Sequence, residues 1–309
     1  MSDLSLGTAP LGGLFTHVDA AEATKVVHRA LELGMTYLDT APQYGHGTAE
    51  RRVGAALVDH PRNSYVLSTK VGRLIVADPH GDTGNFVDAP PSRAVFDFSA
   101  DGIERSLEQS LTRLGLSSVD IVYLHDPDDH ADQAIDEAYP VLDRMRAEGI
   151  VRAIGVGMNQ PEIPTRFVRE TDLDVVLIAG RWSLLDRTAG VELLPECWRR
   201  GVSVVVGGVF NSGLLADPRK GATFDYGPAS PQLVTVAQRL VEVCRDIGVS
   251  LPAAALQFPR RHPSVVSVLM GVRSVAELEA NVVAAGVPLP DELWSAIDAV
   301  VLSEEGRTS

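Results

Sequence analysis

The chain has 309 residues and is 45% hydrophobic, so it can bury a large core as two ordinary domains or as one α/β barrel. Its formal net charge is -14, and no cluster of Lys and Arg interrupts that acidity. Most faces would therefore repel a phosphate backbone, which excludes nucleic acid as an expected partner.

The cysteines and the N-terminus point to a cytoplasmic protein. Cys197 and Cys244 form no CxxC pair and no zinc-ligand spacing, which is typical of reduced thiols. The segment MSDLSLGTAP lacks a basic region followed by a long apolar run, and no stretch reaches the roughly 18 apolar residues that a membrane span needs. We expect a soluble cytoplasmic protein with no membrane partner.

Short apolar runs alternate with amphipathic segments along the whole chain. Each run is continuously apolar at its centre, which is typical of strands covered on both faces. The eight predicted strands cover 4–8, 36–40, 64–70, 119–125, 151–157, 174–180, 202–208 and 265–271.

The segments between these runs have helical spacing, and several begin at Asp or Ser and end at Gly. The clearest cover 19–34, 99–115, 131–149 and 230–248. Strands that alternate with helices in this way predict a (β/α)₈ TIM barrel, and no linker divides the single domain of residues 1–309. A doubly wound sheet is the alternative, but eight repeats in one domain fit it less well.

Two connections are too long for ordinary strand-to-helix loops. Residues 71–98 and 208–230 both follow strands, so both are expected on the C-terminal face of the barrel. Long connections in a compact domain are usually lids or binding loops.

Four polar side chains occupy the ends of consecutive strands. Asp39 and Tyr44 follow the second strand, Lys70 ends the third and His125 ends the fourth. In a barrel these positions converge on the face where active sites are built. Asp39 alone would also suit a helix N-cap and Tyr44 alone a rim position, but neither alternative explains the set.

The residue types indicate proton-transfer chemistry. A phenol needs a nearby cation to favour its ionised form at neutral pH, and Lys70 is the candidate. A buried lysine needs a counter-charge, which Asp39 supplies. A neutral His125 would orient a substrate oxygen toward Tyr44.

The chain resembles the aldo-keto reductase family over essentially its whole length. The motifs are GTAPLGG, YLDTAPQYGHGTAE, LSTKVGR, DIVYLHDPD, IGVGMNQ and MGVRSVAELEAN. The resemblance implies that Tyr44 is the general acid in carbonyl reduction and the base in alcohol oxidation. It also implies that Lys70 tunes the pKa of Tyr44, Asp39 supports Lys70, His125 orients substrate, and hydride moves to or from C4 of a nicotinamide.

The implied cofactor contacts differ in part from the family pattern. Asn159 matches the residue that holds the nicotinamide carboxamide, but Ala179 replaces the usual glutamine. A glycine in VVVGGVFNSGLL replaces the aromatic that stacks on the ring, and Phe210 is the candidate substitute. The remaining implied contacts near the ring and the pyrophosphate are Gly7, Thr8, Asp39, Asn211, Ser212 and Leu214.

The motif MGVRSVAELEAN is similar to the family's adenosine-phosphate segment, with Arg273 and Asn281 in matching places. Gly271 and Glu277 stand where members that prefer NADP carry a lysine and an arginine. Glu277 would repel a 2′-phosphate and accept a hydrogen bond from a free 2′-hydroxyl. We therefore expect NAD, with NADP as the alternative because Arg273 is able to neutralise a phosphate in part.

Within the family, the chain looks most like the sugar-oxidising branch, the L-fucose or D-threo-aldose 1-dehydrogenases. That resemblance implies an aldose substrate oxidised at C1 to a lactone, with Phe15 and Trp182 joining Tyr44 and His125 around the sugar. Alternatives are an NADPH-dependent aldehyde or ketone reductase, an enzyme like pyridoxal 4-dehydrogenase, and a non-catalytic cofactor-binding regulatory subunit.

Two further patterns carry less weight. The acidic run HDPDDHADQAIDE fits the first turn of a helix without an ion, so we expect no metal. GVGMNQ lacks the third glycine of a dinucleotide fingerprint. Neither the oligomeric state nor the direction of catalysis follows from the sequence.

Overall fold

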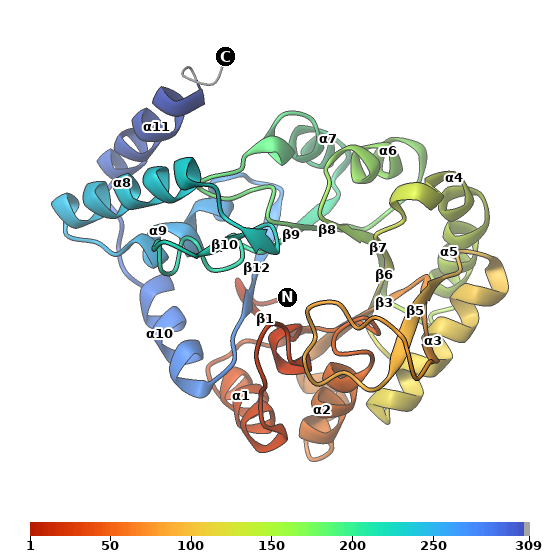
Figure 1. Ribbon diagram of the computed structural model, residues 1–309. Coiled ribbons are helices and arrows are strands. Elements are labelled where there is room, and N and C mark those ends of the chain that lie inside the picture. The colour runs from red at the N-terminus through yellow and green to blue at the C-terminus, as the bar shows by residue number, and fades with distance from the viewer. Residues whose placement is uncertain (306–309) are drawn as a thin grey trace.

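The computed structural model describes residues 1–305 and contains a closed parallel barrel (Figure 1). The strand order is β1-β12-β9-β8-β7-β6-β3-β2, with β1 paired to both β2 and β12. The (β/α)₈ prediction is confirmed and the doubly wound alternative is wrong, because the sheet closes. The last four residues of the predicted domain, 306–309, lie outside the described part. The barrel strands are β1 (Leu4–Gly7), β2 (Tyr37–Asp39), β3 (Val66–Val71), β6 (Ile121–His125), β7 (Ala153–Met158), β8 (Val175–Ala179), β9 (Ser203–Gly207) and β12 (Val265–Gly271).

Helices surround the barrel, and their apolar faces form the main core against the strands. The predicted caps are present: the side chains of Asp19, Ser99 and Ser230 accept hydrogen bonds from the first helical turns, and Gly115 and Gly248 end helices with positive φ. The helices are α1 (Ala20–Glu32), α2 (Thr48–Leu57), α3 (Ala100–Leu114), α4 (Ala131–Gln133), α5 (Tyr139–Ala147), α6 (Glu162–Glu170), α7 (Leu193–Arg200), α8 (Pro231–Ile247), α9 (Leu251–Gln257), α10 (Val275–Ala285) and α11 (Asp291–Glu305).

The segment predicted as one helix over 131–149 is interrupted. A π-helical turn, η4 (Ala134–Ala138), separates α4 from α5. Pro140 lies in the first turn of α5. Because proline lacks an N–H and clashes with the carbonyl four residues earlier, a regular α-helix cannot continue through this point.

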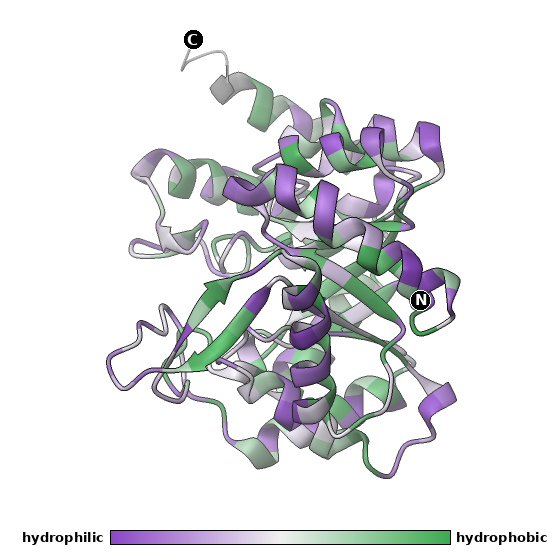
Figure 2. Cartoon of the chain, turned by 90° about the vertical axis from the view of Figure 1, so that its right-hand side faces the viewer, coloured by the Kyte–Doolittle hydropathy of each residue, from purple (hydrophilic) through white to green (hydrophobic). Residues whose placement is uncertain are grey.

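The two long connections lie where the sequence places them, after β3 and β9, but each contains regular structure. Residues 71–98 form an antiparallel hairpin of β4 (Arg73–Ala77) and β5 (Ser92–Phe96). Residues 208–230 contain the short pair β10 (Thr223–Phe224) and β11 (Gly227–Pro228). The side view of Figure 2 shows an antiparallel pair of strands projecting from the barrel.

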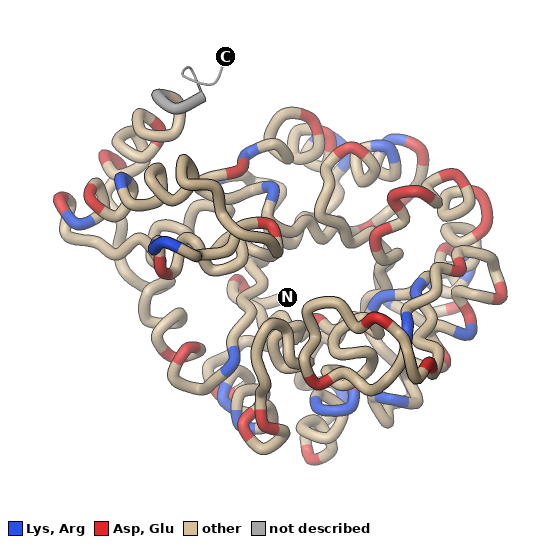
Figure 3. Tube along the Cα trace, viewed as in Figure 1, with Lys and Arg blue, Asp and Glu red and all other residues tan. Residues whose placement is uncertain are grey.

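The outer surface mixes charges of both signs. Figure 3 shows Lys and Arg interspersed with Asp and Glu along the outer helices. Within residues 1–305, none of the helices combines the length and the apolar character required to cross a bilayer.

A glycine sets the distance between α2 and α3. A Cβ atom on Gly54 would lie 2.0 Å from the carbonyl oxygen of Leu114, so no side chain fits between the helices here. We expect Gly54→Ala to lower the free energy of unfolding by about 1–3 kcal/mol through overpacking, measured by urea titration. Gly286→Ala is the matched control, because its Cβ would meet no atom closer than 3.6 Å. Equal stability of the two variants would contradict the close approach.

Candidate active site

The four side chains predicted from the strand ends meet on one rim of the barrel. Lys70 Nζ lies 2.6 Å from Asp39 Oδ2, 3.1 Å from the Tyr44 hydroxyl and 3.1 Å from the carbonyl oxygen of Thr40. The ring of His125 stands edge-on to the Tyr44 ring, with 6.1 Å between the ring centroids. Lys70, Asp39 and His125 are all buried.

A tight turn carries Tyr44 into this group. The amide of Tyr44 bonds to the carbonyl of Ala41, and its own carbonyl accepts from Ala49 in the first turn of α2. Gly45 has φ of 61°, and a Cβ there would lie 2.2 Å from the carbonyl oxygen of Gly12. Only glycine permits both the conformation and this contact, so the turn can fix the phenol over Lys70.

Polar groups inside the barrel hold Asp39. Ser68 donates a hydrogen bond of 2.6 Å to Asp39 Oδ1, and the Tyr37 hydroxyl lies 3.0 Å from both the Ser68 and the Tyr123 hydroxyls. The N-cap alternative for Asp39 is wrong, because Gly47 occupies that position in α2. The carboxylate therefore has a fixed orientation toward Lys70.

Burial sets the protonation state of Tyr44. The pKa of the phenol is raised well above 10, first by desolvation and then by the negative charges of Asp39 and Asp126, while Arg73 opposes the rise. The sequence argument expected Lys70 to favour the phenolate; against this, burial removes the solvation of the phenolate and two carboxylates lie nearby. Burial therefore favours the protonated phenol over the phenolate.

Burial and two cations keep His125 neutral. The pKa of His125 lies well below 6.5 because the ring is desolvated and because Arg73 and Lys70 repel a proton. Its Nδ1 is buried without a hydrogen-bond partner in the described residues. Its Nε2 is 3.6 Å from Asp126 Oδ2, which leaves that nitrogen free for a ligand oxygen.

Tyr44, Lys70 and His125 line a cavity of about 340 Å³ on the C-terminal face. The barrel contributes the polar floor, and the long connections contribute aromatic walls, Phe86 and Tyr226. Sequence reasoning did not select these walls or the charged pair Arg73 and Asp126. Asp126 directly follows His125 at a strand end, which is a usable signal, whereas Tyr226 lies in a loop without periodicity.

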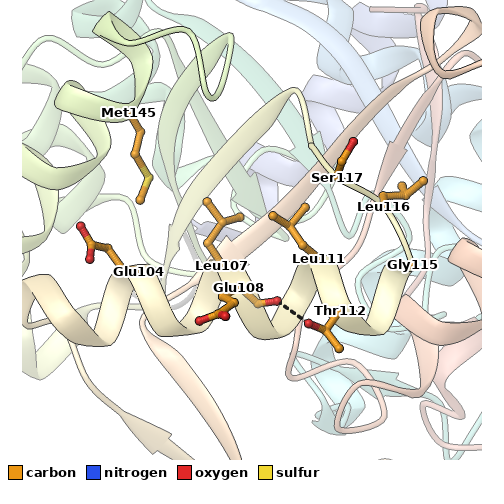
Figure 4. A pocket seen from close by; sticks show the side chains of 9 residues that line it. All are labelled: Glu104, Leu107, Glu108, Leu111, Thr112, Gly115, Leu116, Ser117 and Met145. Atoms are coloured by element: carbon orange, nitrogen blue, oxygen red, sulfur yellow. Dashed lines mark hydrogen bonds between the residues drawn. The ribbon is translucent and has the colours of Figure 1, made fainter.

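A second hollow lies far from this chemistry. It measures about 600 Å³ and lies on the outer face of α3, with Met145 of α5 and residues 115–117 beside it (Figure 4). Leu107, Leu111, Leu116 and Met145 line it beside two carboxylates, Glu108 and Glu104, of which Glu104 is paired with Arg144. The phenol, ammonium and imidazole meet in the barrel cavity instead, so the barrel cavity is the candidate site.

The carboxyl ends of β8 and β9 leave space for a flat ring. Ala179 and Gly207 face each other across β8 and β9, and a Cβ on Gly207 would meet only the Ala179 methyl, at 3.8 Å. The side chain of Asn159 lines the cavity and makes no hydrogen bond within the described chain. Asn211 Oδ1 is buried without a partner among the described residues. Asn211 Nδ2 donates to the carbonyl of Gly180, so Asn211 offers one free acceptor beside the free Asn159 amide, and both could hold the carboxamide of a nicotinamide.

The remaining predicted cofactor residues fall into two groups. Thr8 is buried next to Gly7, and its hydroxyl donates to the carbonyl of Asp39. Ser212 binds the backbone of Tyr226. Four others lie between the end of β12 and the middle of α10: Gly271, Arg273, Glu277 and Asn281.

Arg273 and Glu277 bind each other rather than standing free. Arg273 donates from its backbone and its guanidinium to both Glu277 oxygens, at 2.9 to 3.4 Å. Both side chains are about half exposed. The charge of Arg273 is therefore largely balanced before any ligand arrives.

The structure places three of the predicted contact residues in or against a neighbouring hydrophobic cluster and a fourth at the surface. Trp182 does not line the cavity: its indole packs on Phe258 and donates to the carbonyl of Pro259, because this side of the barrel has its own hydrophobic cluster. Leu214 is fully buried in that cluster, and Phe210 packs against it. Phe15 is exposed, and its ring centroid lies 6.4 Å from that of Tyr226.

Comparison with known proteins identifies the family. The aldo/keto reductase family profile matches residues 3–302. The chain belongs to the aldo/keto reductase family. It is accordingly an oxidoreductase that binds a nicotinamide cofactor and acts on small molecules. No group of three or more His, Cys, Asp or Glu side chains within residues 1–305 is arranged to hold a metal ion.

Two curated relatives and one solved structure are similar over nearly the full length. A D-threo-aldose 1-dehydrogenase of Pseudomonas sp is 41% identical, covering 94% of this chain and 92% of the relative. A pyridoxal 4-dehydrogenase of Microbacterium luteolum is 40% identical, covering 95% and 92%. The holo form of an aldo-keto reductase from Bacillus halodurans has a TM-score of 0.78 at 28% identity, covering 97% and 92%.

The low pKa of His125 makes the stability of the fold depend on pH. Below about 6.5 the unfolded chain binds a proton at this residue that the folded chain does not, so stability falls as the pH falls. Between pH 8 and pH 5 the wild type should lose up to about 2 kcal/mol more unfolding free energy than His125→Gln. Urea titration at both pH values measures the difference. Identical pH profiles for the two proteins would contradict a neutral, buried His125.

Proposed function

We propose that this protein oxidises an aldose at C1 to a lactone with NAD, using Tyr44 as the proton-transfer group. The observation that carries the proposal is the contact of Lys70 Nζ with the Tyr44 hydroxyl, at 3.1 Å, on the floor of a cavity that also holds a neutral His125. A phenol, a cation and a neutral imidazole on one floor suit proton transfer to or from a carbon-bound oxygen.

In oxidation Tyr44 takes the proton of the anomeric hydroxyl, and in reduction it returns a proton to the carbonyl oxygen. His125 Nε2 binds the same oxygen and turns it toward the phenol. A nicotinamide held by Asn159 and Asn211 would supply the hydride acceptor for C1, and its oxidised ring would add a positive charge to the cavity. Positive charge beside the phenol, added to that of Lys70, opposes the effect of burial and favours the phenolate that oxidation needs.

The substrate class rests on two supports. One relative is named for the oxidation of D-threo-aldoses and another for that of pyridoxal, and both are about equally similar to this chain. The cavity combines an ionic wall, Arg73 and Asp126, with aromatic walls, which suits a molecule with several hydroxyl groups and an apolar face. L-fucose and D-arabinose are suitable substrates for an assay.

The location of the protein in the cytoplasm remains a prediction.

The cofactor preference rests on the pair of Arg273 and Glu277. A 2′-phosphate would have to displace Glu277 from Arg273 or lie beside its carboxylate, whereas a 2′-hydroxyl can donate to that carboxylate. Gly271 offers no positive charge nearby. We therefore propose NAD over NADP.

The second candidate function is an NADPH-dependent aldehyde or ketone reductase. The raised pKa of Tyr44 favours it, because a protonated phenol is ready to donate. A non-catalytic regulatory role has no supporting observation in the site.

Removal of the Tyr44 hydroxyl tests the proton-transfer role. We expect Tyr44→Phe to lower kcat by about 10²- to 10⁴-fold, the usual contribution of general acid-base catalysis, with cofactor affinity near that of the wild type. Cofactor affinity is read by protein fluorescence. Tyr139→Phe is the matched control, because that hydroxyl contacts only the backbone near Asp172 on the surface. Wild-type turnover in Tyr44→Phe would refute the role.

The substrate and cofactor are tested by NADH formation at 340 nm with L-fucose, D-arabinose, L-galactose and pyridoxal, each with NAD and with NADP. We expect oxidation of at least one aldose and a higher kcat/KM with NAD. Inactivity on all four compounds, together with NADPH-dependent loss of propanal, would assign the protein to the reductase alternative. A preference for NADP would overturn the role given to Glu277.

A further inference from the structure

Asp126 has an unusual backbone for its position. It follows His125 directly and has φ of 44°, in the left-handed region that non-glycine residues seldom adopt. Its amide bonds to the carbonyl of Gly157 on the neighbouring strand. Such a conformation persists only where the surroundings enforce it, and it aims a carboxylate into the cavity instead of into solvent.

Arg73 holds the carboxylate in place. Its guanidinium donates to Asp126 Oδ2 and stacks on the Phe96 ring, with 4.7 Å from Cζ to the ring centroid. Both members of the pair are mostly buried, with 16% and 17% of their side chains exposed. Burying an ion pair is costly, and this one connects the β4–β5 hairpin to the end of β6 with a single hydrogen bond.

The pair retains unused hydrogen-bonding capacity. Asp126 Oδ1 bonds to no other residue in the described range 1–305, and it is not sealed from solvent. Arg73 Nε is buried and lacks a partner within that range. A carboxylate oxygen only accepts hydrogen bonds, so the free Oδ1 suits a hydroxyl and not a carbonyl.

The spacing to His125 indicates which hydroxyl would bind. Asp126 Oδ2 is 3.6 Å from His125 Nε2, the nitrogen assigned to the reacting oxygen. Oxygens on neighbouring carbons of a sugar lie about one hydrogen-bond length apart. When the first oxygen is at His125, the second is therefore within reach of Asp126.

We propose that Asp126, fixed by Arg73, accepts a hydrogen bond from the hydroxyl on the carbon next to the reacting carbon, and that this contact selects hydroxylated substrates over their deoxy analogues. The proposal rests on the proposed function for the identity of the reacting carbon. A site built to bind a hydroxyl discriminates strongly against a compound that lacks it, because the buried charge then loses its partner.

The test compares D-arabinose with 2-deoxy-D-ribose, which differs from it only by loss of the 2-hydroxyl. The measured quantity is the ratio of the two kcat/KM values. We expect the wild type to prefer D-arabinose, and Asp126→Asn to reduce the ratio by about 10- to 100-fold, the usual effect of losing a hydrogen bond to a charged group. Asparagine tolerates the left-handed backbone, so the variant should fold.

Two further variants separate recognition from structure. Asp126→Gly suits the backbone and removes the acceptor completely, so its ratio should fall at least as far. Asp129→Asn makes the same charge change at an exposed position on the same loop and should leave the ratio unchanged. If the Asp126 variants lower both kcat/KM values equally, or if the wild type shows no preference, the proposal is overturned.

A second substrate pair keeps this result independent of the proposed function. Lactaldehyde and propanal differ only by the hydroxyl on the carbon next to the carbonyl and are assayed by NADH or NADPH oxidation. Inactivity on both sugars would overturn aldose oxidation, and the lactaldehyde-to-propanal ratio would then decide the role of Asp126 by the same criterion. A ratio near one in the wild type would overturn that role as well.

Discussion

The buried contact between Lys70 and Asp39 is the interaction on which the rest of the site depends. An ammonium without a counter-ion is not tolerated in a barrel core, and Asp39 Oδ2 at 2.6 Å supplies that charge. The remaining ammonium protons go to the Thr40 carbonyl and the Tyr44 hydroxyl. The fully satisfied lysine can therefore hold a phenol at a fixed place, which a flexible surface lysine could not do.

Barrel closure turns this contact into a site. Because all barrel strands are parallel, their carboxyl ends share one rim. The strand register, which pairs Asp39 with Ser68 and Lys70 with Tyr123, fixes the positions of the polar groups along the barrel axis. Below them the hydroxyls of the inner layer keep the carboxylate oriented. The rigid element is thus the barrel, and the variable elements are the connections above it.

The connections add what a proton-transfer group alone lacks, namely recognition of a substrate. The β4–β5 hairpin supplies Arg73 and the loop after β9 supplies Tyr226, and both lie at the cavity that contains Tyr44. These connections also bury the site, and burial raises the pKa of Tyr44 and lowers the pKa of His125. Substrate recognition and the protonation states are therefore coupled in one small volume.

The sequence by itself determined the barrel, the approximate strand ranges and the group of Asp39, Tyr44, Lys70 and His125, because apolar runs and the residues that follow them are local properties. Only the tertiary structure decided what lies beside that group. Trp182 faces a hydrophobic cluster, Glu277 is paired with Arg273, and Asp126 enters the cavity through a left-handed backbone. These outcomes depend on contacts between distant segments and on desolvation, neither of which a local pattern encodes.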